Sequence, residues 1–409
     1  MQPKPVGIDW LSIGQLGLGV LSCLISFGLA IGLILLGSTS NLPPGSPHLD
    51  TSILFMLAGL LVSVGLLNIP SILLSWHSLI GKPSESSAKS NAFQVASLAL
   101  ISLPFLLAGS QYAAQTGYSN VMLPFFNVLS LLIPTWWLVE FGRRKLPSGS
   151  PQRNWGLLSA SLGLIPLLII FLEFLCAVLA TLATFAWLSA EPNWIGKLNQ
   201  LYLQLSQANF DPEFLAILLN DLLGNPVVIM MLFVSLGMLM PLIEELVKPL
   251  AVWFLRSRLQ TPAEGFSAGL IAGAGFSLIE STTLIAQLGT KSEWSQMVLL
   301  RIATSLLHMT TSGLIGWGLV SGWTQKKYGR TAVAIMASTC VHGLWNSLVI
   351  SSALQPVMGA LGRQSSVVDF FFRFGNYPFA ILLVFLALVL VHMNHRLRRE
   401  TEKTVPISG

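Results

Sequence analysis

Apolar runs long enough to cross a lipid bilayer recur along the whole sequence. A hydrocarbon core about 30 Å thick needs roughly 20 helical residues, and inside lipid such a segment must satisfy its own backbone hydrogen bonds. Only 10% of the 409 residues are charged, whereas soluble chains carry about 25%. The pattern predicts an all-α polytopic membrane helix bundle. Its ten expected transmembrane helices have the approximate limits 12–37, 52–75, 92–113, 121–141, 156–187, 227–254, 266–288, 297–322, 331–353 and 377–393.

The basic residues predict how this bundle is oriented. Lys and Arg concentrate in the cytoplasmic loops of membrane proteins, and here they fall in alternate loops. The net charge of +5 comes from short clusters between apolar runs, which indicates membrane orientation and no nucleic-acid partner. We expect an integral, multi-pass protein of a bacterial-type plasma membrane with both termini in the cytoplasm. The clusters on that side contain Lys82 and Lys89; Arg143, Arg144, Lys145 and Arg153; Arg256 and Arg258; Lys326, Lys327 and Arg330; and Arg396, Arg398, Arg399 and Lys403.

The distribution of polar residues divides the chain into three regions. Residues 1–225 form a five-helix membrane region, whose outer loop at 190–224 has apolar residues at helical spacing. That spacing predicts an interfacial amphipathic helix, and a lid over a membrane-embedded site is the alternative. Residues 226–355 carry most of the ionisable side chains found within the spans, and residues 356–409 hold the final helix and a basic cytoplasmic tail.

The second region brings ionisable side chains into four predicted spans. They are Glu244, Glu245, Lys248, Glu280, His308 and His342, joined by Asn346. A charge at the bilayer centre costs about 2.5–3.5 kcal/mol, so four facing lipid would cost roughly 10–14 kcal/mol. Residues four apart share a helix face, which pairs Glu244 with Lys248, Phe276 with Glu280, and His342 with Asn346. We therefore expect these residues to line one polar cavity that holds water.

Such a cavity favours hydrolytic chemistry. A carboxylate held beside a second carboxylate and away from bulk water is suited to act as a general base. It would take a proton from water, and the hydroxide would attack an amide carbonyl whose oxyanion is stabilised by histidine or asparagine donors. Two alternatives stay open, because intramembrane Glu, Lys and His also build proton-coupled transporters, and the same set could belong to a non-catalytic membrane scaffold.

Four short motifs resemble the signature of the PrsW family of intramembrane proteases, which belongs to the CAAX prenyl-protease and bacteriocin-processing superfamily. The motifs are "EELVK" (Glu244, Glu245, Lys248), "GFSLIES" (Phe276, Glu280), "HMTTSGLIG" (His308) and "HGLWN" (His342, Asn346), in that order on four successive predicted helices. The resemblance covers roughly residues 227–353, so region 226–355 is expected to be the catalytic core. The sequence departs from the family pattern in two ways. Ser281 stands where relatives often have Asn, and five N-terminal spans precede the matched region.

The resemblance implies a role for each matched residue. Glu244 would be the principal water-activating group and Glu245 would support it. His308 or His342 would orient the water or polarise the carbonyl, and Asn346 would donate to the oxyanion. Glu280 would be either catalytic or a partner of Lys248, and Phe276 would support the site. Family members perform site-1 cleavage of an anti-sigma factor, and relatives trim prenylated or peptide substrates, so a membrane-protein or lipidated peptide substrate is implied.

Metal dependence has two readings at this stage. Glu and His are zinc ligands, and the family has been labelled metalloprotease. However, the sequence contains no H-E-x-x-H, and Lys248 follows the adjacent acidic pair, so its charge would oppose a bound cation. We favour a site without a cofactor. The alternative is zinc held by His308, His342 and Glu280.

Overall fold

The computed structural model describes residues 9–39, 51–82, 91–116, 118–147, 149–207, 211–286 and 294–404. Within these ranges all regular structure is helical, and nine helices are long and apolar enough to cross a membrane. The number is ten if the bent pair α3 (Ala92–Leu100) and α4 (Leu103–Ala113) forms one span. The polytopic all-α bundle is thereby confirmed. The location of the termini stays a prediction, and Lys89 and residues 208–210 and 287–288 lie outside the described residues.

The chain forms two compact units that alternate along the sequence. Unit 1 comprises Met1–Leu167, Lys248–Ile335 and Leu386–Gly409, and unit 2 comprises Leu168–Val247 and Met336–Phe385. Each unit combines segments that are far apart in the sequence, so the units do not test the three predicted regions 1–225, 226–355 and 356–409. Those regions stay a prediction. Three helices pass from one unit into the other, namely α7 (Leu164–Ser189), α15 (Tyr328–Ala360) and α17 (Tyr377–Thr404).

The remaining helices belong to one unit each. Besides α3 and α4, unit 1 contains α1 (Trp10–Thr39), α2 (Thr51–Leu79), α5 (Ser119–Gly142), α6 (Pro151–Leu162), α12 (Leu250–Trp253), the 3-10 helix η2 (Arg256–Arg258), α13 (Pro262–Ala286) and α14 (Trp294–Gln325). Unit 2 contains α8 (Pro192–Gln207), α9 (Pro212–Leu223), α10 (Pro226–Val234), the π-helix η1 (Ser235–Leu239), α11 (Met240–Val247) and α16 (Ser366–Phe372).

Proline and glycine explain where two predicted spans depart from straight helices. The predicted span 92–113 is bent by 42° between α3 and α4. Pro104 lies at the start of α4 and lacks the backbone N–H that would continue the helix. The predicted span 156–187 lies in a 39-residue helical segment, Pro151–Ser189, which is interrupted at Gly163 between α6 and α7. At 1.5 Å per residue this segment is about 58 Å long, which exceeds the hydrocarbon core.

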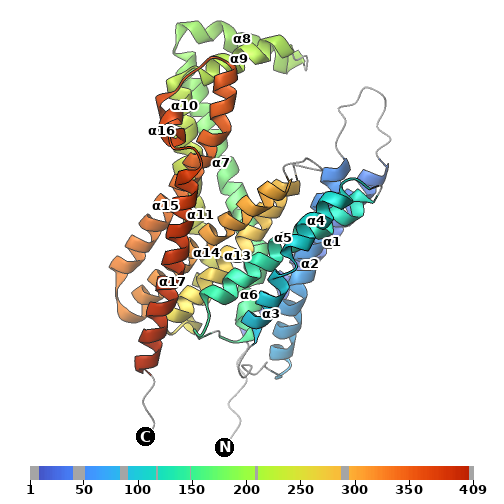
Figure 1. Cartoon of the computed structure of the whole chain (residues 1–409), viewed down its shortest axis with the longest axis vertical. Coiled ribbons are helices and arrows are strands. Elements are labelled where there is room, and N and C mark those ends of the chain that lie inside the picture. The colour runs from blue at the N-terminus through green and yellow to red at the C-terminus, as the bar shows by residue number, and fades with distance from the viewer. Residues whose placement is uncertain are drawn as a thin grey trace, which may run out of the picture. The chain divides into compact units, whose positions relative to one another are not determined.

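Glycines allow α13 and α14 to pack backbone against backbone. Gly265, Gly269 and Gly273 recur every four residues and lie on one face of α13. A Cβ atom on Gly269 would lie 2.1 Å from the carbonyl oxygen of Ser312, and one on Gly273 would lie 2.3 Å from that of His308. Small residues bring membrane helices this close, and Figure 1 shows the two helices side by side. The contact fixes the part of α13 that follows Gly273 against the turn of α14 that carries His308.

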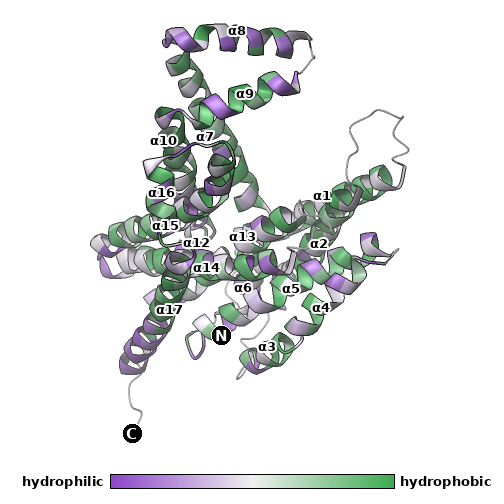
Figure 2. Ribbon diagram, turned by 45° about the horizontal axis from the view of Figure 1, so that its top comes forward, coloured by the Kyte–Doolittle hydropathy of each residue, from purple (hydrophilic) through white to green (hydrophobic). Residues whose placement is uncertain are grey.

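The predicted amphipathic segment of the outer loop is helical. It forms α8 and α9, and Figure 2 shows polar and apolar residues mixed along α8. Four buried apolar side chains from α7, α8 and α9 pack together, namely Leu188, Trp194, Phe214 and Leu218. The apolar spacing read from the sequence is therefore used for packing within unit 2.

Candidate functional site

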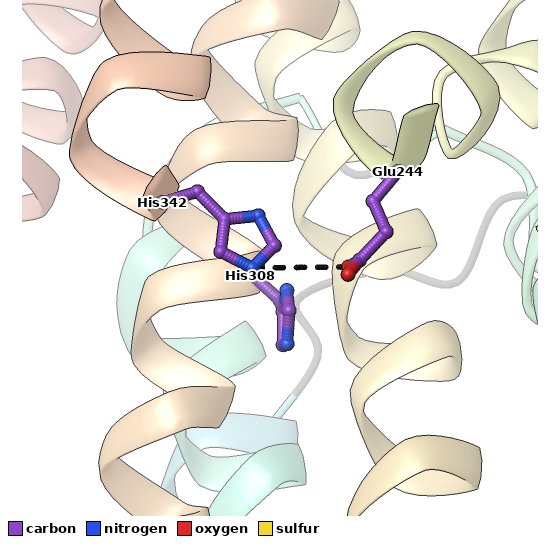
Figure 3. Close-up of side chains that lie close together, drawn as sticks. All are labelled: Glu244, His308 and His342. Carbon is purple, nitrogen blue, oxygen red and sulfur yellow. Dashed lines mark ion pairs between the residues drawn. The ribbon is translucent and has the colours of Figure 1, made fainter. Parts of the chain in front are cut away.

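In unit 2 the two adjacent glutamates of α11 flank one imidazole of α15. The Nδ1 atom of His342 lies 2.9 Å from Oε1 of Glu245, and its Nε2 atom lies 3.8 Å from Oε2 of Glu244 (Figure 3). Successive residues point about 100° apart on a helix, so one glutamate reaches each side of the ring. All three side chains are buried, with at most 5% of any residue exposed. Three of the residues expected from the sequence to line one polar cavity thus lie beside one another in this unit, and their catalytic roles stay a prediction.

A π-helix directly before α11 sets the position of these glutamates. In η1 the backbone N–H of Met240 donates to the carbonyl of Ser235, five residues earlier. Pro241 has no N–H to donate, so the carbonyl of Leu236 needs a donor from elsewhere. The side-chain amide of Asn346 supplies it, at 3.1 Å. Isolated π-turns inside α-helices occur frequently at functional sites.

Asn346 therefore has a structural partner that its sequence motif did not predict. One N–H of its amide is used by the Leu236 carbonyl, and a primary amide carries a second N–H. The two elements approach closely here, because a Cβ on Gly343 would lie 2.5 Å from the carbonyl oxygen of Gly237. Two contacts thus hold α15, which carries His342, against η1. They are the close approach of Gly343 to Gly237 and the hydrogen bond of Asn346 to Leu236.

In unit 1 a histidine lies between a lysine and a glutamate. The Nδ1 atom of His308 is 2.8 Å from Nζ of Lys248, and its Nε2 atom is 2.7 Å from Oε2 of Glu280. An ammonium group can only donate. With Lys248 protonated, Nδ1 accepts and Nε2 carries the proton that is donated to Glu280. Lys248 and His308 are completely buried, so this arrangement uses both ring nitrogens of His308 to satisfy neighbouring charges.

Phe276 provides an aromatic wall for the same cluster. The Lys248 ammonium lies 4.6 Å from the centre of the Phe276 ring. The Phe276 and His308 rings meet edge to face, with centroids 5.1 Å apart and an 81° angle between planes. A desolvated cation over an aromatic face gains about 2 kcal/mol. Phe276 and Glu280, predicted to share a helix face, both contact His308.

Sequence reasoning missed Arg301, which completes the cluster of unit 1. Its Nη2 atom lies 2.6 Å from Oε2 of Glu280, and its Nε donates to the hydroxyl of Ser281 at 3.0 Å. Arg301 is 8% exposed and lies on α14 seven residues before His308, which places both on one face. That spacing, within an apolar run, is the signal that could have identified it. Ser281, the departure from the family pattern, is the hydroxyl that accepts from Arg301.

The two clusters carry opposite formal charge. In unit 1 two cations, Lys248 and Arg301, and one anion, Glu280, leave +1 when His308 is neutral. In unit 2 the carboxylates of Glu244 and Glu245 leave −2 when His342 is neutral. Ionisable side chains within membrane spans are costly, so both clusters are candidates for a functional site.

The donor chemistry of each cluster bears on metal binding. Carboxylate-bound histidines commonly serve as zinc ligands through their other nitrogen, and His342 is held in this way by Glu245, with Glu244 near Nε2. Catalytic zinc sites use three protein ligands. In unit 1 both nitrogens of His308 are hydrogen-bonded, one of them to a cation. The residues within either unit therefore do not by themselves form the predicted ligand set of His308, His342 and Glu280.

The protein is therefore an integral membrane protein that carries buried acidic and imidazole side chains within its helical bundle. Such residues mark a candidate functional site. Residues 213–389 match the family model described as PrsW family intramembrane metalloprotease. The match includes all four motifs, so this region is similar to the family that the motifs predicted, and that family is one of intramembrane proteases. No curated protein and no solved structure matches the chain.

Proposed function

We propose that the protein is an intramembrane endopeptidase that hydrolyses peptide bonds of membrane-associated substrates with a water activated by glutamate. The observation that carries the proposal is the His342 imidazole flanked by two adjacent buried carboxylates, Glu244 and Glu245. The family match supports the protease class. The substrate class we propose is a membrane-anchored or lipidated peptide, cleaved in regulated proteolysis or signalling at a plasma membrane.

In this mechanism Glu244 is the general base. It takes a proton from a water molecule, and the resulting hydroxide forms a C–O bond to the scissile carbonyl carbon. When the C–N bond breaks, the same proton passes to the leaving amine nitrogen. Glu245 holds the imidazole of His342 through Nδ1, so that Nε2 faces the water beside Glu244.

We infer that the cluster of unit 1 stabilises the oxyanion of this same reaction. Lys248 follows Glu244 by four residues, and α15, which carries His342, runs from unit 1 into unit 2. The opposite formal charges of the clusters would compensate one another if both served one site. His308 and Lys248 would supply positive electrostatic potential at the developing oxyanion, Glu280 and Arg301 would orient His308, and the second N–H of Asn346 would donate to the oxyanion.

A metal-assisted version is the second candidate, because the matching family is described as metalloprotease. The carboxylate of Glu244 and the imidazoles of His342 and His308 have the donor chemistry of zinc, with Glu280 as a further acid. A bound zinc would lower the pKa of its water to about 7. In this version His308 would have to exchange its hydrogen bond with Lys248 for the metal. We propose the metal-free version because that lysine is completely buried against the ring.

The test is cleavage of single-pass membrane substrates by the purified protein in liposomes. Loss of the general base in Glu244→Gln should lower turnover about 10²–10⁴-fold. Glu173→Gln is the matched control, since Glu173 is an intramembrane glutamate of α7, a helix that carries none of the named cluster residues, and it should retain wild-type turnover. Chelator treatment should leave turnover unchanged, and loss of turnover that zinc restores would establish the metal-assisted version.

Two outcomes would replace the proposal. Wild-type protein that cleaves no substrate but still assembles with membrane partners would support the scaffold. Proton flux through liposomes that Glu244→Gln abolishes, without any cleavage, would support the transporter.

A further inference from the structure

We propose that unit 1 binds the phosphate of an anionic phospholipid headgroup in a pocket at the ends of α12 and α14. The pocket has a volume of about 420 Å³, within the range of about 300–1,000 Å³ typical of small-molecule sites. Its polar wall consists of Arg256, Ser257, Gln260 and Thr324, and its apolar wall includes Phe254 and Trp323. This inference concerns a second site and does not depend on the proposed protease activity.

Arg256 is oriented for an anion by an aromatic platform. Its guanidinium carbon lies 5.7 Å from the centre of the Trp323 ring, and Trp253 packs edge to face against the same ring, with centroids 5.4 Å apart. A guanidinium over a tryptophan face keeps N–H groups at its edges for oxygen ligands, and its planar fork matches phosphate. The platform thus reduces the freedom that Arg256 would lose on binding.

Comparison with the neighbouring arginine shows that Arg256 is available for a ligand. Arg258, two residues later, is paired with Asp9 at 2.7 Å. Within the residues that the structure describes, Arg256 forms no ion pair with a carboxylate. Glu264 accepts from the backbone N–H of Gln260 in the pocket wall, and it is paired with Arg153 at 2.8 Å. Among the described residues, Arg256 is therefore a cation of the pocket that has no carboxylate partner.

The surroundings favour a lipid as the source of this phosphate. The two apolar segments Pro226–Trp253 and Trp294–Gln325 both end at the pocket. Trp253 is 46% exposed and Phe254 55% exposed, which gives acyl chains an apolar surface directly beside the cation. Tryptophan is enriched where spans meet the headgroup layer, and basic pockets between spans on the cytoplasmic side bind acidic headgroups. The predicted orientation places Arg256 on that side.

The experiment measures lipid-dependent thermal stability of the full-length protein in a neutral detergent. Phosphatidylglycerol should raise the apparent Tm in a saturable manner, and phosphatidylcholine should not. Arg256→Gln should raise the half-saturating phosphatidylglycerol concentration about tenfold or more, because a charge-assisted phosphate contact is lost. Arg258→Gln, which removes the paired neighbour, should change it less than about threefold.

A change of the aromatic platform and a soluble anion test the site in two further ways. Trp323→Leu removes the platform but keeps Arg256, and it should also weaken phosphatidylglycerol binding, as counted by native mass spectrometry even if the variant is less stable. Equal shifts with both lipids, or unchanged binding in Arg256→Gln and Trp323→Leu, would overturn the site. Sodium phosphate that reproduces the full shift would overturn the lipid as the source and leave a soluble anion.

Discussion

The polar clusters of the two units differ in how their charges are held. In unit 1 each ionisable group contacts an opposite charge or a hydrogen-bonding ring, from Arg301 through Glu280 and His308 to Lys248. In unit 2 two adjacent carboxylates flank one imidazole. Ion-paired buried networks stabilise the fold when complete, whereas like charges held together are a feature of reactive sites. Changes in unit 1 should therefore alter stability first, and changes in unit 2 should alter activity first.

The strongest test of this contrast is a double-mutant cycle in unit 1. Arg301→Gln leaves Glu280, whose side chain is 30% exposed, without its guanidinium. Breaking a fully buried pair from one side costs about 3–5 kcal/mol, so we expect a smaller loss here. Removing both partners, in Arg301→Gln with Glu280→Gln, should cost less than the two single changes together, because neither member of the pair is left charged without the other. Reversible unfolding in detergent measures all three variants. Additive losses would show that the pair is not coupled.

In unit 2 the corresponding change should separate activity from stability. Glu245→Gln keeps an oxygen that can accept from Nδ1 of His342 but removes the charge that holds the ring. Hydrogen-bond partners of metal-bound histidines contribute about 10–100-fold, and we expect turnover to fall by a comparable factor when Glu245 no longer holds His342. The apparent Tm should stay the same or rise, because one of two neighbouring negative charges is removed. A lower Tm with unchanged turnover of the folded fraction would reverse the contrast.

The close backbone contact between α13 and α14 predicts that packing also contributes to the stability of unit 1. In Gly273→Ala the new methyl group would meet the carbonyl oxygen of His308 at 2.3 Å. Such overpacking should destabilise the folded protein by about 1–3 kcal/mol. Gly28→Ala is the matched control, because a Cβ there meets no atom within 4 Å, and a mid-helix alanine should stabilise by about 0.5–1 kcal/mol. Thermal unfolding of both variants checks the difference in sign.

The smallest expected effect lies outside the membrane spans. Burial raises the pKa of Asp9, but the Ser12 hydroxyl, which donates at 2.6 Å, and the Arg258 guanidinium lower that pKa by more. A carboxyl whose folded pKa is lowered stabilises the protein above its unfolded value, and this stability is lost as pH falls through the folded pKa. Asp9→Asn should therefore cost less than about 1 kcal/mol at neutral pH. A cost that persists at low pH, measured by unfolding in buffers on either side of the ordinary value of 3.8, would contradict this origin.

Helical periodicity predicted much of the candidate site, and its failures have a common cause. The spacing of Phe276 and Glu280 predicted that they share a helix face, but it did not predict that both contact His308. Arg301 was overlooked because it lies near the end of a predicted span, where arginines commonly reach the interface. Asn346 was assigned a role toward substrate, and its contact with Leu236 depends on a π-turn that no sequence motif specified.

The sequence by itself determined the helical membrane fold, the spans and the four motifs, because lipid admits few backbone conformations and the intramembrane charges are too costly to be incidental. The tertiary structure alone decided which group each charge contacts: Glu245 with His342, Lys248 with His308, and Arg301 with Glu280 and Ser281. The physical reason is that a helix fixes which residues share a face, whereas the rotation and approach of neighbouring helices, set by contacts such as Gly273 against His308, fix what that face meets.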